Sequence, residues 1–408
     1  MMKRRCQTTA CAILALSLCS STFAQDQSML PQPNLPTPRT APLLIPQAPD
    51  VDAKAFMLID ASSGKILAQK NADEKLPPAS LTKMMTLYII ADALASGRIH
   101  LDDKVTISNH AWRMGGSKMF VKVGEKVPVK DLVQGIIVAS GNDACVAMAE
   151  YIAGAEDDFV NIMNQQAQLL GMSNTHFTDC TGMPHPDHYS TPHDLALLAR
   201  AIVKQHPDFY KQFFAEKWFT WNGIRQPNRN RLLWRDSDVD GIKTGHTNAA
   251  GYCLVSSGLH DGMRLVSVVM GAPSDEGRTQ SSQRLLSYGF RFYETHTLYQ
   301  AGAPLASPRV WLGQKRTVPL GITKDIVVTI PSGQYKQLKA SMELDNVVKA
   351  PVAKLQPLGN LVVTLDDKVI AQSPLVALES DTKGSLWQRF SDSMYLFYRR
   401  MVGHKANA

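Results

Sequence analysis

The chain reads PPASLTKMMTLYII from Pro77 to Ile90. The two prolines disfavour helix on their N-terminal side, whereas the apolar residues that follow have a helical face, so we predict a helix over Leu81–Ala95. Residues three positions apart lie on one face of a helix. The stretch therefore predicts that the hydroxyl of Ser80 and the amine of Lys83 lie side by side.

A second Ser-x-x-Lys string, Ser62 to Lys65, shows that the pattern alone is weak. Apolar runs at Ala55–Ile59 and Ile66–Ala68 flank a short polar stretch with a glycine, which is typical of a hairpin turn. We therefore interpret Ser62 as a turn residue.

Two more strings, Ser140-Gly141-Asn142 and Lys243-Thr244-Gly245, follow Ser80 in order. Average residue frequencies make this ordered trio a coincidence of well under about one per cent. A serine hydroxyl needs a base to become a good nucleophile, and no Ser-His-Asp pattern is evident. A neutral lysine can be that base, and burial or a second cation lowers its pKa.

Each string thus has an expected part in an acyl-transfer site. Lys83 is the predicted base, Lys243 the second cation, and Ser140 the group that returns a proton to the leaving amine. The remaining positions are predicted to bind substrate. The Asn142 amide binds the backbone of the substrate, and Lys243 and Thr244 bind a carboxylate. Gly245 allows the substrate to approach a strand closely.

The composition is that of a soluble globular protein with room for two domains: 408 residues, 44% apolar and 19% charged. The net charge of +7 is accompanied by no aromatic-basic motif, so we expect no nucleic-acid partner. An anionic membrane surface or wall polymer fits the charge better.

The N-terminus has the pattern of a secretory signal peptide. Basic residues at positions 3–5 precede an apolar stretch from Ala10 to Leu18, and small residues precede a predicted cut after Ala24. The apolar stretch is too short to span a bilayer. Residues 1–24 are therefore predicted to be removed, and the proline-rich residues 25–50 to form a linker.

Removal of the signal peptide leaves Cys145, Cys180 and Cys253, an odd number in an oxidising compartment. At most one pair can form, and buried thiols are the favoured interpretation.

Three histidines, His185, His188 and His193, lie close together but match no zinc-ligand spacing. Thr191-Pro192 begins a helix that includes His193. We expect no metal and no cofactor.

Residues 51–298 mix strand-like and helix-like stretches, which predicts an α+β domain. Expected strands are 56–59, 252–256 and 265–269, and expected helices are 81–95, 144–152, 157–170 and 280–294. Residues 299–380 alternate with period two, with a turn at Asp366-Asp367, and predict a smaller all-β domain.

Residues 381–408 carry apolar residues at helical spacing, interrupted by charges such as Arg389 and Asp392. A helix lying in the membrane interface is favoured over a helix docked on its own domain.

From Ile45 to Phe397 the chain resembles the low-molecular-mass D-alanyl-D-alanine carboxypeptidases, the penicillin-binding protein 5 and 6 group. The resemblance is carried by residues 78–85 (PASLTKMM), 140–145 (SGNDAC), 228–230 (NRN) and 240–247 (DGIKTGHT). It implies the penicillin-binding and β-lactamase-like serine peptidase fold, with an antiparallel sheet and helices.

The resemblance implies that Ser80 is acylated by a peptidoglycan stem peptide, which loses its terminal D-Ala. Backbone N–H groups of Ser80 and His246 would form the oxyanion hole. Arg229 and Arg264 would hold the terminal carboxylate. It also implies inhibition by β-lactams and a periplasmic enzyme attached peripherally to the outer face of the inner membrane through its C-terminal helix.

One position departs from the group. Thr181 stands where those enzymes have histidine, in a loop that borders their site, which puts the rate of deacylation in question.

Three alternatives stay open. Class A β-lactamases use an additional glutamate, but no ExxLN string occurs between the second and third motifs. A DD-endopeptidase or transpeptidase shares the same motifs. The non-enzymatic alternative is a wall-binding morphogenetic protein, against which the intact motifs argue.

Overall fold

The computed structural model describes residues 45–345 and 347–403. The predicted signal peptide and most of the predicted linker lie outside these residues.

An antiparallel five-stranded sheet, in the order β2-β1-β9-β8-β7, forms the centre of the first domain. Its strands are β1 (Ala55–Asp60), β2 (Ile66–Lys70), β7 (Val239–Thr247), β8 (Gly251–His260) and β9 (Met263–Ala272). The α+β class and the three strands predicted from the sequence are confirmed, and Ser62 lies in the β1–β2 turn.

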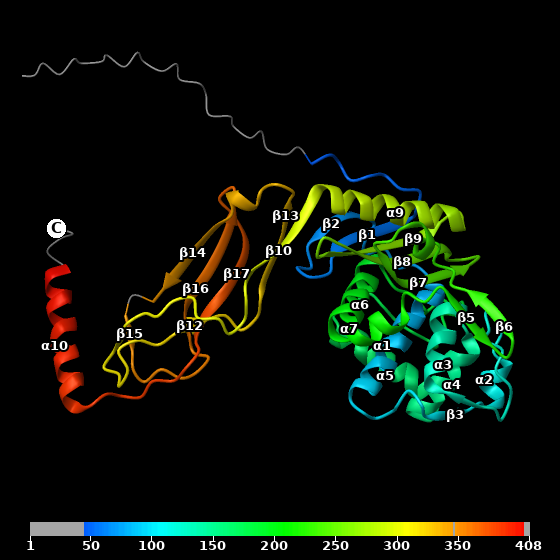
Figure 1. The fold of residues 1–408 in the computed structure, drawn as a ribbon, viewed down its shortest axis with the longest axis horizontal. Helices are drawn as coiled ribbons and strands as arrows, with labels where there is room; N and C mark the ends of the chain where they lie inside the picture. The colour runs from blue at the N-terminus through cyan, green and yellow to red at the C-terminus, as the bar shows by residue number, and fades with distance from the viewer. Residues whose placement is uncertain (1–44, 346, 404–408) are drawn as a thin grey trace, which may run out of the picture. The chain divides into compact units, whose positions relative to one another are not determined.

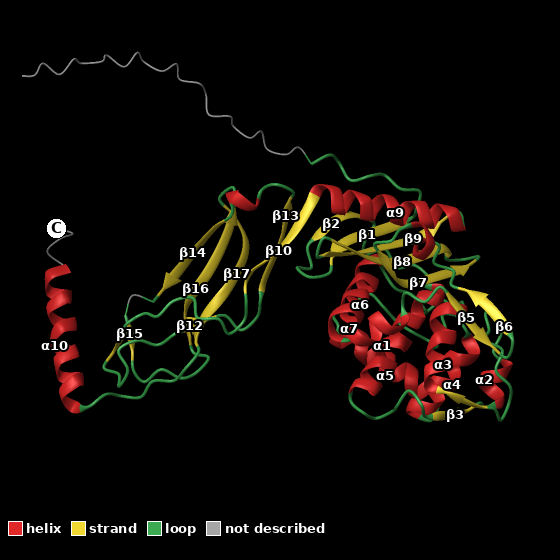
Figure 2. Ribbon diagram, in the orientation of Figure 1, coloured by secondary structure: helices red, strands yellow, loops and turns green. Residues whose placement is uncertain are grey.

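Both faces of this sheet are covered by helices (Figures 1 and 2). All six residues of β1 are buried, because successive side chains point to opposite faces and each face has its own core. Met57 and Ile59 belong to the core shared with the larger group of helices. Phe56 and Leu58 belong to the core beneath α9 (Asp275–Phe292).

The other helices and short turns of this domain are η1 (Ala79–Thr82), α1 (Lys83–Ala95), α2 (Asn109–Arg113), α3 (Val129–Gln134), η2 (Gly135–Ala139), α4 (Asn142–Ala153), α5 (Glu156–Leu169), α6 (Pro192–Gln205), α7 (Pro207–Phe213) and α8 (Leu232–Arg235). Two ribbons complete it: β3 (Lys104–Thr106) with β4 (Lys126–Pro128), and β5 (Trp218–Trp221) with β6 (Ile224–Pro227). The predicted start of α6 is confirmed, since the Thr191 side chain caps it by accepting from Asp194 N.

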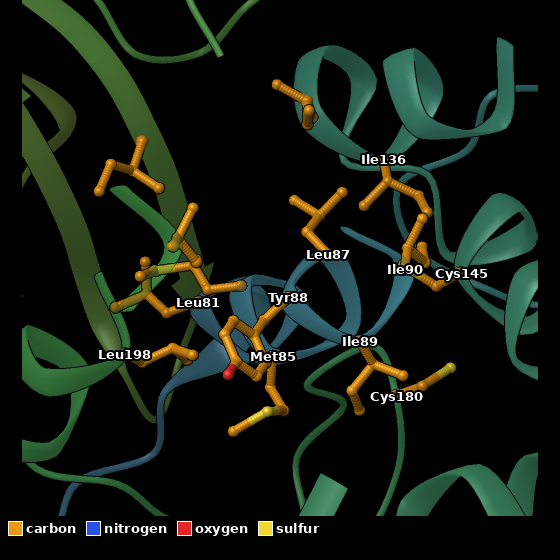
Figure 3. Close-up of a cluster of buried hydrophobic side chains, with 14 of the residues drawn as sticks. Leu81, Met85, Leu87, Tyr88, Ile89, Ile90, Ile136, Cys145, Cys180 and Leu198 are labelled. Carbon is orange, nitrogen blue, oxygen red and sulfur yellow. The ribbon is translucent and has the colours of Figure 1, made fainter. Parts of the chain in front are cut away.

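Helix α1 is buried on nearly all sides, as expected for a helix whose residues are apolar all round. Figure 3 shows Leu87 and Ile90 on this helix among apolar side chains from other elements, with Cys145 near Ile90. The predicted helix began at Leu81, but α1 begins at Lys83, and Ser80 and Leu81 lie in the 3₁₀ turn η1 that precedes it. The packing of α1 fixes this turn in the core of the domain.

The second domain is all-β, as predicted, but its first strand begins earlier than residue 299. Helix α9 ends at Phe292 rather than Glu294, because Tyr293 is extended and opens β10. The strands are β10 (Tyr293–Tyr299), β11 (Val310–Trp311), β12 (Leu320–Gly321), β13 (Ile326–Pro331), β14 (Lys339–Leu344), β15 (Val348–Lys349), β16 (Pro357–Leu365) and β17 (Lys368–Ala377), with a 3₁₀ turn η3 (Tyr335–Gln337).

Four of these strands form a sheet in the order β12-β17-β16-β14. The predicted turn at Asp366-Asp367 is confirmed: it joins β16 to β17 with φ values of +50° and +61°, as in the tight turns that fit the strand twist.

The last element is α10 (Leu386–Gly403). None of the helices in the described part of the chain combines the length and the apolarity needed to cross a membrane. The three cysteines at positions 145, 180 and 253 are buried free thiols, in agreement with the interpretation of the sequence.

Candidate active site

Two lysine–serine pairs form the centre of the candidate site. Lys83 Nζ donates a hydrogen bond of 3.0 Å to Ser80 Oγ. Lys243 Nζ, on β7, donates one of 3.0 Å to Ser140 Oγ. The first and third sequence strings are in direct contact, because β7 packs against η1. The pairing expected between a serine nucleophile and a lysine base is thus present in the structure.

Gly245 makes this packing possible. A Cβ at this position would lie 2.9 Å from Pro78 O and 3.2 Å from Leu81 N, both backbone atoms. The sequence analysis assigned this glycine to the approach of substrate. The structure shows that it first permits the approach of β7 to the turn that carries Ser80.

Ser140 follows the π-turn η2 and adopts a left-handed conformation, with φ +59° and ψ +35°. The left-handed region of backbone conformation is unfavourable for residues other than glycine. Non-glycine residues that adopt it concentrate at functional sites. The conformation turns the chain sharply between η2 and α4.

Asn142 begins α4, and its side chain is almost fully buried. Its Nδ2 donates to Gly115 O at 2.7 Å. The orientation of this amide is therefore set by the loop that precedes Ser117, before any substrate is bound.

Both lysines are buried, and their pKa values reflect it. Burial lowers the pKa of Lys83 below the usual 10.5. Burial, and after it the charge of Lys83, lowers the pKa of Lys243 well below the same value. Two buried ammonium groups oppose each other's charge, so the neutral form that a base requires becomes accessible.

Near the end of β7 lies a cavity of about 540 Å³, the basic cavity, whose lining carries four basic side chains, Arg231 among them, and the carboxylate of Asp275. Arg229 and His246, both predicted from the sequence, line it together with Arg278. Arg229 Nη1 donates to Ser117 Oγ at 2.8 Å. Arg278 is buried: its Nη1 donates to Gly245 O and Cys253 O at 2.9 and 3.2 Å, and its Nη2 pairs with the carboxylate of Asp275 in the first turn of α9.

Arg278 was not predicted as a site residue, because the helix that contains it, α9, was expected to begin at Gln280. Ser274 caps α9, and acidic residues occupy the first turn. A capping serine followed by acidic residues is a helix-start signature. With the helix start at Ser274, Arg278 falls in the first turns of α9, close to the end of the sheet that carries residues 243–247.

Arg264, in contrast, is not brought to this cavity. It forms a bidentate pair with Asp240 and also donates to Ser257 Oγ. The lining of the cavity does not include it. The predicted contact of Arg264 with the substrate carboxylate is therefore not proposed for this enzyme.

Thr181 does border the site, as the resemblance implied for its loop. Its backbone oxygen accepts a hydrogen bond of 2.6 Å from Lys83 Nζ. His188 of the histidine cluster also points here, with Nε2 2.8 Å from Thr82 Oγ1. Among the described residues, no group of three or more histidine, cysteine or acidic side chains is arranged to hold a metal ion.

Comparisons with known proteins agree with this geometry. The sequence profile of the D-alanyl-D-alanine carboxypeptidase family matches residues 43–274, and that of the penicillin-binding protein 5 C-terminal domain matches residues 293–383. The chain is 44% identical to the D-alanyl-D-alanine carboxypeptidase DacA of Escherichia coli K12 over 410 residues, covering 98% of both chains.

Solved structures show the same likeness. Penicillin-binding protein 5 of Haemophilus influenzae is 44% identical with a TM-score of 0.80, over 83% of this chain and all of that one. Penicillin-binding protein D2 of Listeria monocytogenes, solved in its ampicillin-bound form, is 29% identical with a TM-score of 0.55, over 60% of this chain and all of that one. The chain therefore belongs to the D-alanyl-D-alanine carboxypeptidase family of penicillin-binding proteins.

Proposed function

We propose that this enzyme removes the terminal D-Ala from peptidoglycan stem pentapeptides through an acyl-enzyme on Ser80. The observation that carries the proposal is the 3.0 Å contact between Lys83 Nζ and Ser80 Oγ, with Lys83 completely buried. A buried lysine in contact with a serine hydroxyl can accept its proton once the amine is neutral.

In the acylation step, Lys83 takes the proton of Ser80, and Ser80 Oγ attacks the carbonyl carbon of the penultimate D-Ala. The negative charge that develops on the carbonyl oxygen is bound by the backbone N–H groups of Ser80 and His246. The proton taken up by Lys83 returns through Ser140 to the nitrogen of the terminal D-Ala, the C–N bond breaks, and an ester with Ser80 is left. The hydrogen bond from Lys243 Nζ to Ser140 Oγ holds the hydroxyl in place for this relay.

Recognition of the terminal carboxylate falls to the basic cavity. Arg229 and Arg278, which line the cavity, supply guanidinium groups that suit a carboxylate, and Thr244 on β7 supplies a hydroxyl. Asn142 binds the backbone of the peptide from the opposite wall. This arrangement favours a peptide with a free C-terminus, which is the basis for a carboxypeptidase rather than an endopeptidase.

Water then releases the shortened peptide from Ser80. We propose that β-lactams acylate the same serine and leave slowly, which is supported by the ampicillin-bound state of the Listeria relative. Rapid multiple-turnover hydrolysis of penicillin by the purified protein would contradict this part of the proposal and favour a β-lactamase.

We further propose that the enzyme is exported to the periplasm and lies on the outer face of the inner membrane through α10. One broad face of this helix is apolar and solvent-exposed, with Trp387, Phe390 and Phe397 each at least 60% exposed. Other residues of α10 contact the β domain: Asp392 accepts from Leu312 N at 2.8 Å, and Tyr395 stacks on Trp311. The exposed aromatic face suits a membrane interface.

Mass spectrometry of a stem pentapeptide ending in D-Ala-D-Ala tests the activity. We expect the purified enzyme to release one D-Ala, Ser80→Ala to release none, and Ser62→Ala to act like the parent, since Ser62 belongs to the other Ser-x-x-Lys string. Absence of release by the parent would favour the non-catalytic wall-binding protein. Added acceptor amines that yield cross-linked product would indicate a transpeptidase.

Liposome flotation with and without the residues beyond Gly384 tests the membrane attachment. We expect the full chain to float with anionic vesicles and the truncated chain to stay at the bottom. Equal flotation of the two would remove α10 from the proposal.

A further inference from the structure

Residues 179–183 pack directly against the turn that carries Ser80. Gly182 has φ +89°, and a Cβ there would lie 1.8 Å from Ala79 O, so only glycine allows this approach. Cys180 O accepts from Thr86 Oγ1 of α1 at 2.7 Å. The loop is therefore packed closely against both the nucleophile turn and α1.

Asp179 organises this loop. Its Oδ1 accepts from Thr181 N at 2.6 Å, from Thr181 Oγ1 at 2.7 Å and from Gly182 N at 2.6 Å. The Gly182 N–H and the Thr181 carbonyl belong to one planar trans peptide unit, so they point in opposite directions. Because Asp179 holds the N–H, the carbonyl points away from it, and there it accepts the 2.6 Å hydrogen bond from Lys83 Nζ.

The other oxygen of Asp179 connects to the residue before Lys83. Asp179 Oδ2 lies 3.3 Å from Nδ1 of His188, whose ring is almost fully buried, and Thr178 N donates to the same ring nitrogen at 3.2 Å. His188 Nε2 lies 2.8 Å from Thr82 Oγ1. One carboxylate is thus linked to the backbone of Lys83 through Thr82 and to its side chain through Thr181.

We propose that Asp179 is a positioning residue for the catalytic base: by holding the Thr181–Gly182 peptide and the His188 ring, it directs the free electron pair of Lys83 at Ser80 Oγ. A neutral amine has two hydrogens and one electron pair, and the Thr181 carbonyl takes up one hydrogen. Rotation of the amine is then restricted, and the electron pair can face the hydroxyl. The inference rests on the proposed role of Lys83 as the base.

Asp179 also acts on Lys83 through its charge. The groups that face Lys83 and favour its charged form are Cys145, Cys180 and Asp179, whereas Arg229 and Lys243 oppose that form. Burial raises the pKa of Cys145 to about 12 and that of Cys180 well above its usual value, so both thiols are neutral near pH 7.

Asp179 is consequently the anion of this set. Burial alone raises its pKa, but the hydrogen bonds and charge of His188 and the hydrogen bonds of Thr181 outweigh burial and hold the pKa well below the usual value. Replacing Asp179 by a neutral residue removes a contribution that raises the pKa of Lys83. The pKa of Lys83 then falls further, and the lysine becomes a weaker base.

The test compares Asp179→Asn with the parent in the full chain, using the rate at which a fluorescent penicillin acylates Ser80, measured across pH. We expect the acylation rate constant to fall by about ten- to a hundredfold through misorientation of the base. We also expect the acid limb of the profile to move to lower pH, because the loss of the Asp179 charge lowers the pKa of Lys83 further. The control is Asp187→Asn, the same substitution at an exposed carboxylate eight positions after Asp179, and we expect it to behave like the parent.

Thr181→Val provides a second variant, because it removes one hydrogen bond to Asp179 and keeps the carbonyl that binds Lys83. We expect a smaller fall in acylation rate with an unshifted acid limb. An Asp179→Asn protein with the parent's rate and acid limb would overturn the inference. A slower variant with an unmoved acid limb and a lowered melting temperature would also overturn it, since that is a structural role only. Failure of the parent itself to react would instead count against the proposed function.

Discussion

The guanidinium of Arg264 donates hydrogen bonds of 2.8 and 2.7 Å to the two carboxylate oxygens of Asp240. Tyr210 OH donates to the same carboxylate at 2.6 Å, and the guanidinium lies 5.3 Å from the centre of the Tyr210 ring. This closed set joins β7, β9 and α7. Arg264 therefore holds the sheet to a helix, whereas Arg278 of α9 lines the basic cavity together with Arg229 and Arg231.

Arg264→Gln should lower stability without changing catalysis. The pair is mostly buried, so its loss should lower the free energy of unfolding by about 1–3 kcal/mol. Denaturant unfolding measures this loss, and the kcat/KM for D-Ala release should stay near the parent value. A large rise in KM with unchanged stability would return Arg264 to the substrate site.

Arg278→Gln, in contrast to Arg264→Gln, should lower the kcat/KM for D-Ala release. A guanidinium that binds a substrate carboxylate contributes about 1.5–3 kcal/mol, which corresponds to a fall of about ten- to a hundredfold in kcat/KM. Steady-state kinetics with a pentapeptide and with its C-terminal amide distinguish this role. The variant should lose the parent's preference for the free acid, and a variant that keeps this preference would contradict the assignment.

The pH dependence of both activity and stability should report on Lys83. Because burial places the pKa of Lys83 below 10.5 in the folded chain, acylation should rise with pH through that lowered value. Between this value and the pKa of the unfolded chain, the native state binds fewer protons than the unfolded state. The free energy of unfolding should therefore rise with pH across this window.

Lys83→Met checks both parts of this expectation. Acylation should fall by about 10²–10⁴-fold, the usual contribution of a general base. Unfolding measured at several pH values should show a weaker rise than in the parent. An equal rise in the two proteins would mean that Lys83 titrates normally.

Gly245→Ala should impair catalysis more than stability. The added methyl group meets backbone atoms of Pro78 and Leu81, so β7 and the nucleophile turn must separate by a few tenths of an ångström. Displacements at this position should lower kcat/KM by about ten- to a hundredfold. Gly262→Ala is the control, since it strains the β8–β9 turn at φ +80° and should lower the melting temperature while leaving kcat/KM unchanged.

Local sequence patterns predicted the elements that depend on neighbouring residues. The turn at Ser62, the capped start of α6 and the alternation of the second domain are set by contacts within a few residues, and each was found as predicted. The contact of Ser80 with Lys83 belongs to this group, since three residues of chain bring the two together. Helix boundaries were predicted less accurately than turns. Helix α9 begins five residues before its predicted start, where an acidic first turn follows Ser274.

Local patterns in the sequence predicted a serine and a lysine one turn apart, two further motifs and an α+β domain followed by an all-β domain. The distant groups that surround this pair depend on tertiary contacts. Arg264 and Arg278 look alike in the sequence and each pairs with an aspartate, but Arg264 on β9 pairs with Asp240 of β7, whereas Arg278 on α9 pairs with Asp275 of its own helix and lines the cavity. Thr181 lies 98 positions from Lys83, and its contact runs through a backbone carbonyl, whose direction depends on folding and not on residue type.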